Sequence, residues 1–224
     1  MGQLLLVRHG QASFGAEDYD VLSETGWEQG RRLGAHLAAA GVRPTVLLRG
    51  GMRRHRETLE AMLEGAGWAA PAGPAVEEDA RWDEFDHLGV VARFPDLPAD
   101  PFSLDRKEFQ ALFERATELW TSGGEGYDES WHDFGARTSA ALADAVARSG
   151  SGQTVVVVTS GGVVGLVAAG LLGVSGAALP DTWQRLNTVA VNSGVTRVLV
   201  GPRGTRLLTF NEHEHLAGEL LTYR

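Results

Sequence analysis

The sequence contains no cysteine, a single lysine and no long uninterrupted apolar segment. The absence of cysteine excludes disulfide bonds, thiolate catalysis and cysteine-rich zinc sites. The apolar run near the N-terminus is too short for a signal peptide and lacks a charged region before it, and no other stretch reaches membrane-spanning length without interruption. We therefore expect a cytoplasmic protein with no membrane partner.

Basic side chains are also in deficit. The chain has 29 aspartates and glutamates against 20 lysines and arginines, which gives a formal net charge of -9. Binding to nucleic acid normally requires a basic surface that neutralises phosphates, so the charge argues against nucleic acid, and we expect no such partner. An anionic small molecule would require only a local basic pocket. The length of 224 residues fits one substantial core, and we expect a single domain over residues 1–224.

Apolar patterning predicts strands that alternate with helices. Short apolar runs at 3–7, 45–48 and 154–159 are typical of buried strands. Thr25 with Glu28 predicts a capping box at the start of a helix that closes near Gly41. Further helices are predicted at 53–64, 105–120 and 129–148 and from 160 onward, and β-rich runs at 188–200 and 205–212 pair through a turn at 201–204. The alternation indicates an α/β domain.

Residues 65–101 are rich in glycine, proline and acidic side chains. This composition predicts long connections with little regular structure, and a rim or lid over about 65–105. Functional residues are common in such segments.

Arg8, His9 and Gly10 come directly after the first predicted strand, where open α/β sheets place ligand sites. A neutral imidazole there can attack phosphorus, and Arg8 can hold phosphoryl oxygens with charge-assisted hydrogen bonds. Gly10 lets the backbone approach a ligand closely. The tripeptide by itself also fits a loop ion pair beside a solvated histidine, so its meaning depends on the surrounding motifs.

Those motifs resemble the start of the histidine phosphatase superfamily, which includes cofactor-dependent phosphoglycerate mutases and many small-molecule phosphatases. The family signature is an apolar strand, Arg-His-Gly, a loop, and a helix opened by Leu-(Ser/Thr)-x-x-Gly-x-x-Gln-(Ala/Gly). The matching residues in the second part are Leu22, Ser23, Gly26, Gln29 and Gly30. The resemblance implies an α/β fold with a mostly parallel central sheet between layers of helices, and His9 as a nucleophile that forms phosphohistidine.

The resemblance extends along the whole chain. "LLRGGMRRHRETLEAM" is similar to the segment with the family's second phosphate-binding arginine, which implies that role for Arg54. In "ARWDEFDHLG", Glu84 stands where the family places its general acid, with Asp83 and Asp86 as alternatives. "ESWHDFGARTSAAL" and "NEHEHL" match later family motifs. The phosphate site implied by the resemblance also includes Gln11.

The chain departs from the family at "VVTSGG", where Ser160 stands in place of a second histidine. The turn still leads from a strand into a helix, so backbone amides near Gly161 and the helix dipole form an anion site, and Ser160 keeps a hydroxyl donor. We hypothesise that His55 or His87 supplies the missing imidazole, because the resemblance places both segments near the pocket. Imidazoles more than about 8 Å from His9 would exclude this compensation.

Three other functions are weighed against a phosphatase. A serine hydrolase with Ser160 as nucleophile would need Gly-x-Ser-x-Gly, but Val158 occupies the first glycine position. A protein that only binds a phosphorylated ligand would keep the two arginines for affinity without forming phosphohistidine. A phosphoglycerate mutase-type phosphotransferase also remains open, although 68–101 looks too short and acidic to supply basic contacts for a bisphosphate.

The resemblance therefore implies a phosphomonoester hydrolase that acts on a small phosphorylated metabolite. Phosphoryl transfer depends chiefly on positioning and electrostatics, so no metal or other cofactor is expected. Substrate selectivity is expected to lie in the loops Phe14 to Asp20 and Trp82 to Pro101. The oligomeric state stays open, a homodimer included.

Overall fold

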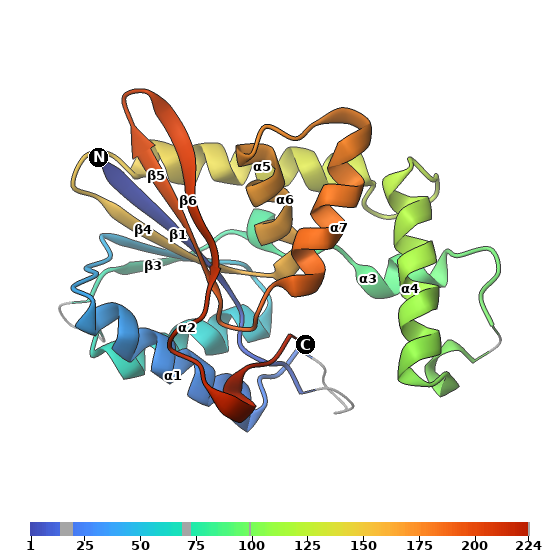
Figure 1. Ribbon diagram of the computed structural model, residues 1–224, viewed down its shortest axis with the longest axis horizontal. Helices are drawn as coiled ribbons and strands as arrows, with labels where there is room; N and C mark the ends of the chain where they lie inside the picture. Colours follow the sequence, from blue (N-terminus) through green and yellow to red (C-terminus); the bar gives the residue numbers. More distant parts are fainter. Residues whose placement is uncertain (14–19, 69–72, 99, 224) are drawn as a thin grey trace. The chain divides into compact units, whose positions relative to one another are not determined.

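A computed structural model describes residues 1–13, 20–68, 73–98 and 100–223 (Figure 1). The strands are β1 (Gly2–Arg8), β2 (Val46–Arg49), β3 (Ala75–Glu78), β4 (Thr154–Thr159), β5 (Val195–Gly201) and β6 (Gly204–Glu212). The helices are α1 (Glu24–Ala39), α2 (Arg53–Ala66), α3 (His87–Ala92), α4 (Arg106–Thr121), α5 (Trp131–Arg148), α6 (Gly161–Leu171) and α7 (Leu179–Val189), with short 3₁₀ turns between them. Contacts group the chain into a larger unit, Met1–Asp83 with Thr138–Arg224, and a smaller unit, Glu84–Arg137.

The larger unit is built on one mixed sheet whose strand order, over the described residues, is β3-β2-β4-β1-β5-β6. Strands β3, β2, β4 and β1 pair in parallel, whereas β5 is antiparallel to both β1 and β6. Gly201 pairs with Gly204 at the β5–β6 turn, as predicted. The expected α/β fold with a mostly parallel sheet is confirmed.

Both faces of the sheet are covered by helices. Figure 1 shows α1 and α2 on one face and α6 with α7 on the other. Leu5 and Val7 of β1 and Val156 of β4 pack with Leu33 of α1 and Met62 of α2 in a fully buried cluster. Their neighbours along each strand are buried on the opposite face, which explains why β1 and β4 appear in the sequence as continuous apolar runs. The core thus holds the carboxyl ends of β1 and β4 rigidly side by side.

Several element boundaries differ from the sequence-based prediction. Helix α1 begins at Glu24 with Ser23 as its N-cap, because the Ser23 Oγ accepts from the Gly26 N–H at 3.1 Å; the capping box predicted at Thr25 is wrong. Residues 188–189 end α7 instead of opening a strand, because the helical pattern that buries Trp183 continues through them. The segment 65–101 contains β3 and α3. Strand β3 is exposed at every position, so it lacks the apolar pattern that identifies a strand.

The smaller unit packs around aromatic side chains. Phe85 stacks on Trp120 of α4 with ring centroids 4.7 Å apart, and both contact Phe134 at the start of α5. Arg137 pairs with Glu129 and lies over the Phe134 ring. No helix among the described residues is long and apolar enough to cross a membrane.

Candidate active site

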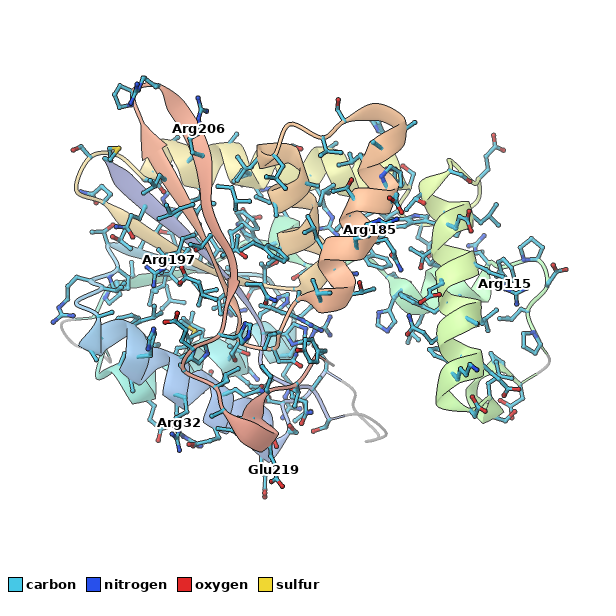
Figure 2. All side chains as sticks on the ribbon, in the orientation of Figure 1. Arg32, Arg115, Arg185, Arg197, Arg206 and Glu219 are labelled. Atoms are coloured by element: carbon cyan, nitrogen blue, oxygen red, sulfur yellow. The ribbon has the colours of Figure 1, made fainter. Side chains whose placement is uncertain are left out.

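Most of the arginines labelled in Figure 2 form ion pairs at the surface of the protein. Arg32 pairs with Glu28, Arg185 with Asp181 and Arg197 with Glu212, at 2.6 to 2.8 Å. Exposed pairs, such as those of Arg32 and Arg185, contribute little to stability. The candidate site is instead defined by two arginines that are withdrawn from solvent, Arg54 and the half-buried Arg8.

His9 follows β1 directly and is fixed by the neighbouring strand. Its N–H donates to the Thr159 carbonyl at the end of β4, at 2.8 Å, and its own carbonyl accepts from the Ser193 N–H. The imidazole Nδ1 lies 2.7 Å from the Gly10 carbonyl oxygen. Since a carbonyl only accepts, Nδ1 carries the proton, and Nε2 keeps the lone pair that a nucleophile requires.

The electrostatic surroundings keep this imidazole neutral. Burial lowers the pKa of His9 well below its usual value, and the positive charges of Arg54 and Arg8 lower it further. His9 is therefore neutral at neutral pH, with its single ring proton on Nδ1, since burial and nearby cations both disfavour a charged imidazole. A neutral ring whose surroundings include two guanidinium groups is suited to attack on an anionic group.

Arg8 is held between two distant segments of the chain. Its guanidinium donates to the carbonyl of Ala190, after α7, and to the carbonyl of Tyr223 near the C-terminus at 2.9 Å. A Cβ built on Gly161 would lie 3.3 Å from Arg8 Nε, so the start of α6 passes close to the same guanidinium. Arg8 thereby ties the end of β1 to the segment after α7 and to the C-terminal residues, close to the start of α6.

Arg54 lies in the first turn of α2 and forms an ion pair within the site. Its guanidinium contacts the Asp20 carboxylate at 2.7 Å, and the other oxygen of Asp20 accepts from the Arg53 N–H, also at 2.7 Å. Glu57 compensates the Arg53 side chain at 2.6 Å, and Arg56 pairs with Glu60 at 3.7 Å. The arginine-rich start of α2 is thus balanced by acids.

The buried imidazole of His55 occupies the space beside Ser160. His55 Nε2 lies 2.7 Å from Ser160 Oγ, and both side chains are fully buried. The rings of His55 and His9 have centroids 5.8 Å apart. This separation falls inside the limit of about 8 Å set for compensation, so His55 meets the geometric condition.

Asp83 contacts the opposite edge of the same ring. Its Oδ1 lies 3.5 Å from His55 Nδ1 and accepts from the N–H groups of Gly51 and Met52, just before α2. Although burial alone would raise the pKa of Asp83, these contacts hold it below its usual value. An ionised Asp83 orients the Nδ1–H of His55 toward itself, which leaves Nε2 to accept from the Ser160 hydroxyl.

The backbone between β2 and α2 has to be glycine for this contact to form. A Cβ built on Gly50 would lie 2.3 Å from His55 Nδ1 and 2.4 Å from Asp83 Oδ1. Burial lowers the pKa of His55, with the contact to the Asp83 carboxylate at 3.5 Å acting in the opposite direction. His55 is therefore neutral in the unliganded site and stays responsive to an added anion.

The remaining residues predicted for phosphate binding serve structural contacts as well. Gly10 packs against α1, where a Cβ would lie 2.5 Å from the Gly26 carbonyl oxygen. Gln11 Oε1 accepts from the Ser23 hydroxyl at 2.9 Å. Gly161 opens α6 next to Asn187, whose side-chain oxygen would lie 2.7 Å from an added Cβ. Their roles toward a ligand remain predictions.

The predicted acid and the second candidate imidazole belong to the smaller unit. Glu84 is its first residue, and His87 opens α3 with its ring 6.4 Å from Phe113. Asp86 caps α3 by accepting from the Gly89 N–H at 2.9 Å. The role of Glu84 as acid and that of His87 as a compensating imidazole both stay predictions. Of the loop predicted to select substrate, residues 14–19 lie outside the described residues.

Sequence reasoning missed two carboxylates of the site. Asp83 was considered only as a substitute acid, and Asp20 only as the end of a loop. The signal for Asp83 was weak: it stands 28 residues after His55, beyond any local pattern. In the described part of the chain, no three His, Asp or Glu side chains are grouped closely enough to hold a metal ion.

Solved structures with this fold include several phosphatases. A mycobacterial glucosyl-3-phosphoglycerate phosphatase complexed with VO3 is 22% identical, with a TM-score of 0.65 over 94% of this chain and 99% of that one. A phosphoserine phosphatase from Entamoeba histolytica in complex with phosphoserine is 17% identical, with a TM-score of 0.65 over 97% of this chain and 100% of that one. A putative alpha-ribazole-5'-P phosphatase from Escherichia coli has the same identity, coverage and TM-score as the phosphoserine phosphatase. No curated protein matches the chain.

The sequence also matches a family model. The model describes the histidine phosphatase superfamily (branch 1), and it matches residues 4–213. That range includes the end of β1, the first turn of α2 and the start of α6, which together form the site around His9. The chain therefore belongs to branch 1 of the histidine phosphatase superfamily.

Proposed function

We propose that the protein hydrolyses phosphomonoesters of small metabolites through a phosphohistidine intermediate on His9. The observation that carries the proposal is the protonation state of that ring: Nδ1–H donates to the Gly10 carbonyl, while two nearby guanidinium groups and burial lower the pKa of His9. The lone pair of Nε2 is thus available at neutral pH beside the guanidinium groups of Arg54 and Arg8. Family membership supports a phosphatase.

In the first step, His9 Nε2 forms a bond to phosphorus and the bond from phosphorus to the ester oxygen breaks. Arg8 and Arg54 hold the non-bridging oxygens, whose charge they stabilise as the transferring group flattens. The leaving oxygen takes a proton from a carboxylic acid, for which Glu84 is the first candidate. In the second step, water attacks the phosphohistidine, the same carboxylate accepts its proton, and inorganic phosphate leaves.

His55 completes the electrostatic complement of the site in this proposal. A phosphoryl dianion next to His9 would raise the pKa of the neighbouring His55 ring, because opposite charges favour the ionised form. Protonated Nε2 would then donate to Ser160 Oγ, which frees the Ser160 hydroxyl hydrogen to point toward a phosphoryl oxygen. The imidazole that the family places at the end of β4 is thus supplied from α2, at a ring distance of 5.8 Å from His9.

The proposed substrate class is supported by the similar solved structures together with the anion site around His9. Those structures are phosphatases of phosphoserine, glucosyl-3-phosphoglycerate and alpha-ribazole phosphate, each a small phosphorylated molecule. We propose a substrate of this size class for the present chain, handled in the cytoplasm without a cofactor.

Hydrolysis of p-nitrophenyl phosphate by the wild type and by His9→Ala tests the proposal. The wild type should hydrolyse the ester and should carry acid-labile phosphate on the protein when the reaction is quenched during turnover. His9→Ala should show neither property. Equal rates in the two proteins would refute the phosphohistidine route. Turnover by His9→Ala, together with wild-type protein that carries no acid-labile phosphate, would refute it as well. Binding of inorganic phosphate without turnover would point instead to a protein that only binds phosphorylated ligands.

A further inference from the structure

The ion pair between Asp20 and Arg54 places a negative charge inside the anion site. One carboxylate oxygen contacts the Arg54 guanidinium and the other accepts from the Arg53 N–H, both at 2.7 Å. A phosphoryl group would use the same kinds of donor, a guanidinium and backbone amides at a helix N-terminus. The Asp20 side chain is 33% exposed, so it stands on the solvent side of the buried Arg54.

Among the residues that the structure describes, the charges around His9 are closely balanced. Arg8 and Arg54 contribute two positive charges, and Asp20 and Asp83 contribute two negative charges within contact distance of the site's own groups. The neighbouring Arg53 is compensated by Glu57 at 2.6 Å. A phosphoryl dianion already exceeds what this arrangement neutralises, and a second anionic group on the same small molecule would add a further unfavourable charge.

We infer that Asp20 is a specificity-determining residue, which favours phosphomonoesters whose organic part carries no second anionic group. A carboxylate oxygen and a phosphoryl oxygen that share the Arg54 guanidinium are separated by no more than two hydrogen bonds and the N–C–N link between its nitrogens. In a metabolite of three or four carbons, a second charge must then lie close to Asp20, and like charges so placed repel across a partly desolvated interface. The inference rests on the proposed function, because it takes Arg54 as a phosphoryl ligand.

The test compares two esters that differ in one charge, glycerol 3-phosphate and 3-phosphoglycerate. We expect the wild type to prefer glycerol 3-phosphate in kcat/KM, and Asp20→Asn to reduce that preference by about tenfold, the effect of like charges roughly 7 Å apart at an intermediate effective dielectric. Asn keeps an oxygen that can accept from the Arg53 N–H. The ratio of the two esters cancels any general change in activity.

Two control variants distinguish charge from shape and position. Asp20→Glu keeps the negative charge and should keep the wild-type preference. Asp181→Asn removes a carboxylate from an exposed ion pair with Arg185 and should leave the preference unchanged. An unchanged ratio in Asp20→Asn would overturn the inference. So would a loss of preference in Asp20→Glu equal to that in Asp20→Asn, because shape would then explain the effect.

Binding separates this inference from the proposed function. Calorimetric titration of the two esters into His9→Ala, with and without Asp20→Asn, measures the preference as a ratio of dissociation constants, in the absence of turnover. Absence of turnover in the wild type would refute the proposed phosphatase activity, yet the ratio of dissociation constants would still test the role of Asp20 in specificity. A binding ratio that does not change with Asp20→Asn would overturn the inference even in an active enzyme.

Discussion

Glutamine in place of His55 keeps a polar group beside Ser160 and removes the ring that can take up a proton. The ring centroids of His55 and His9 are 5.8 Å apart. At an effective dielectric of about 20, one unit charge at that distance stabilises an opposite unit charge by about 3 kcal/mol. If the charge of the transferring phosphoryl group develops next to His9, His55→Gln should lower kcat by about 100-fold, in line with the loss of one preorganised donor.

The assay is steady-state hydrolysis of p-nitrophenyl phosphate as a function of pH. Because a bound dianion raises the pKa of His55, wild-type kcat should fall as the pH rises through the pKa of His55 in the complex. That limb should be absent in His55→Gln. His132→Gln is the control, since the His132 side chain is 91% exposed. Circular dichroism at the assay temperature checks that the variants are folded.

Folded His55→Gln protein with kcat within about threefold of the wild type would refute the reasoning, since a nearby charge should contribute far more than that. A second experiment places a histidine side chain at the end of β4. Ser160→His alone should be destabilised by about 1–3 kcal/mol, because both side chains are already fully buried and a second ring overpacks the site. Combining it with His55→Ala should relieve the overpacking and recover much of the lost kcat. No recovery in this double variant would argue that the two positions are not equivalent.

Two further predictions concern the same site and a separate histidine. Gly50→Ala places a Cβ 2.3 Å from His55 Nδ1 and 2.4 Å from Asp83 Oδ1, so it should separate this pair and lower kcat about as much as His55→Gln, as measured by steady-state kinetics. Wild-type kcat in a folded Gly50→Ala variant would show that the contact with Asp83 is dispensable. Burial and the charge of a neighbouring histidine lower the pKa of His215 to about 4. Below pH 6.5 the unfolded chain therefore binds a proton that the folded protein does not, and stability decreases from pH 6.5 toward 4. His215→Gln should show a weaker decrease in urea midpoint over this range, and an identical slope would contradict the assignment.

The sequence alone determined the features that depend on local pattern and order. The continuous apolar runs of β1 and β4 identified strands covered on both faces, and Arg8 and His9 were placed at a strand end because they follow the first run directly. The order of motifs was enough to indicate the histidine phosphatase superfamily, which the family match confirmed. The sequence alone did not fix where helices begin. The N-cap of α1 is Ser23, and not the predicted Thr25, because the Ser23 hydroxyl reaches the Gly26 N–H, and this contact depends on backbone geometry.

Only the tertiary structure decided which side chains meet at the site. The sequence named His55 and His87 as equal candidates beside Ser160, and His55 is in contact because parallel pairing aligns Arg49 of β2 with Val158 of β4, next to the starts of α2 and α6. The contact joins residues 105 positions apart, a distance in sequence that no local pattern encodes. Asp20 accepts from the first N–H of α2, and Asp83 accepts from the N–H groups of Gly51 and Met52 just before that helix, so both contacts join residues remote in sequence. Burial and neighbouring charge then set the protonation of His9 and His55, and both depend on the packed fold.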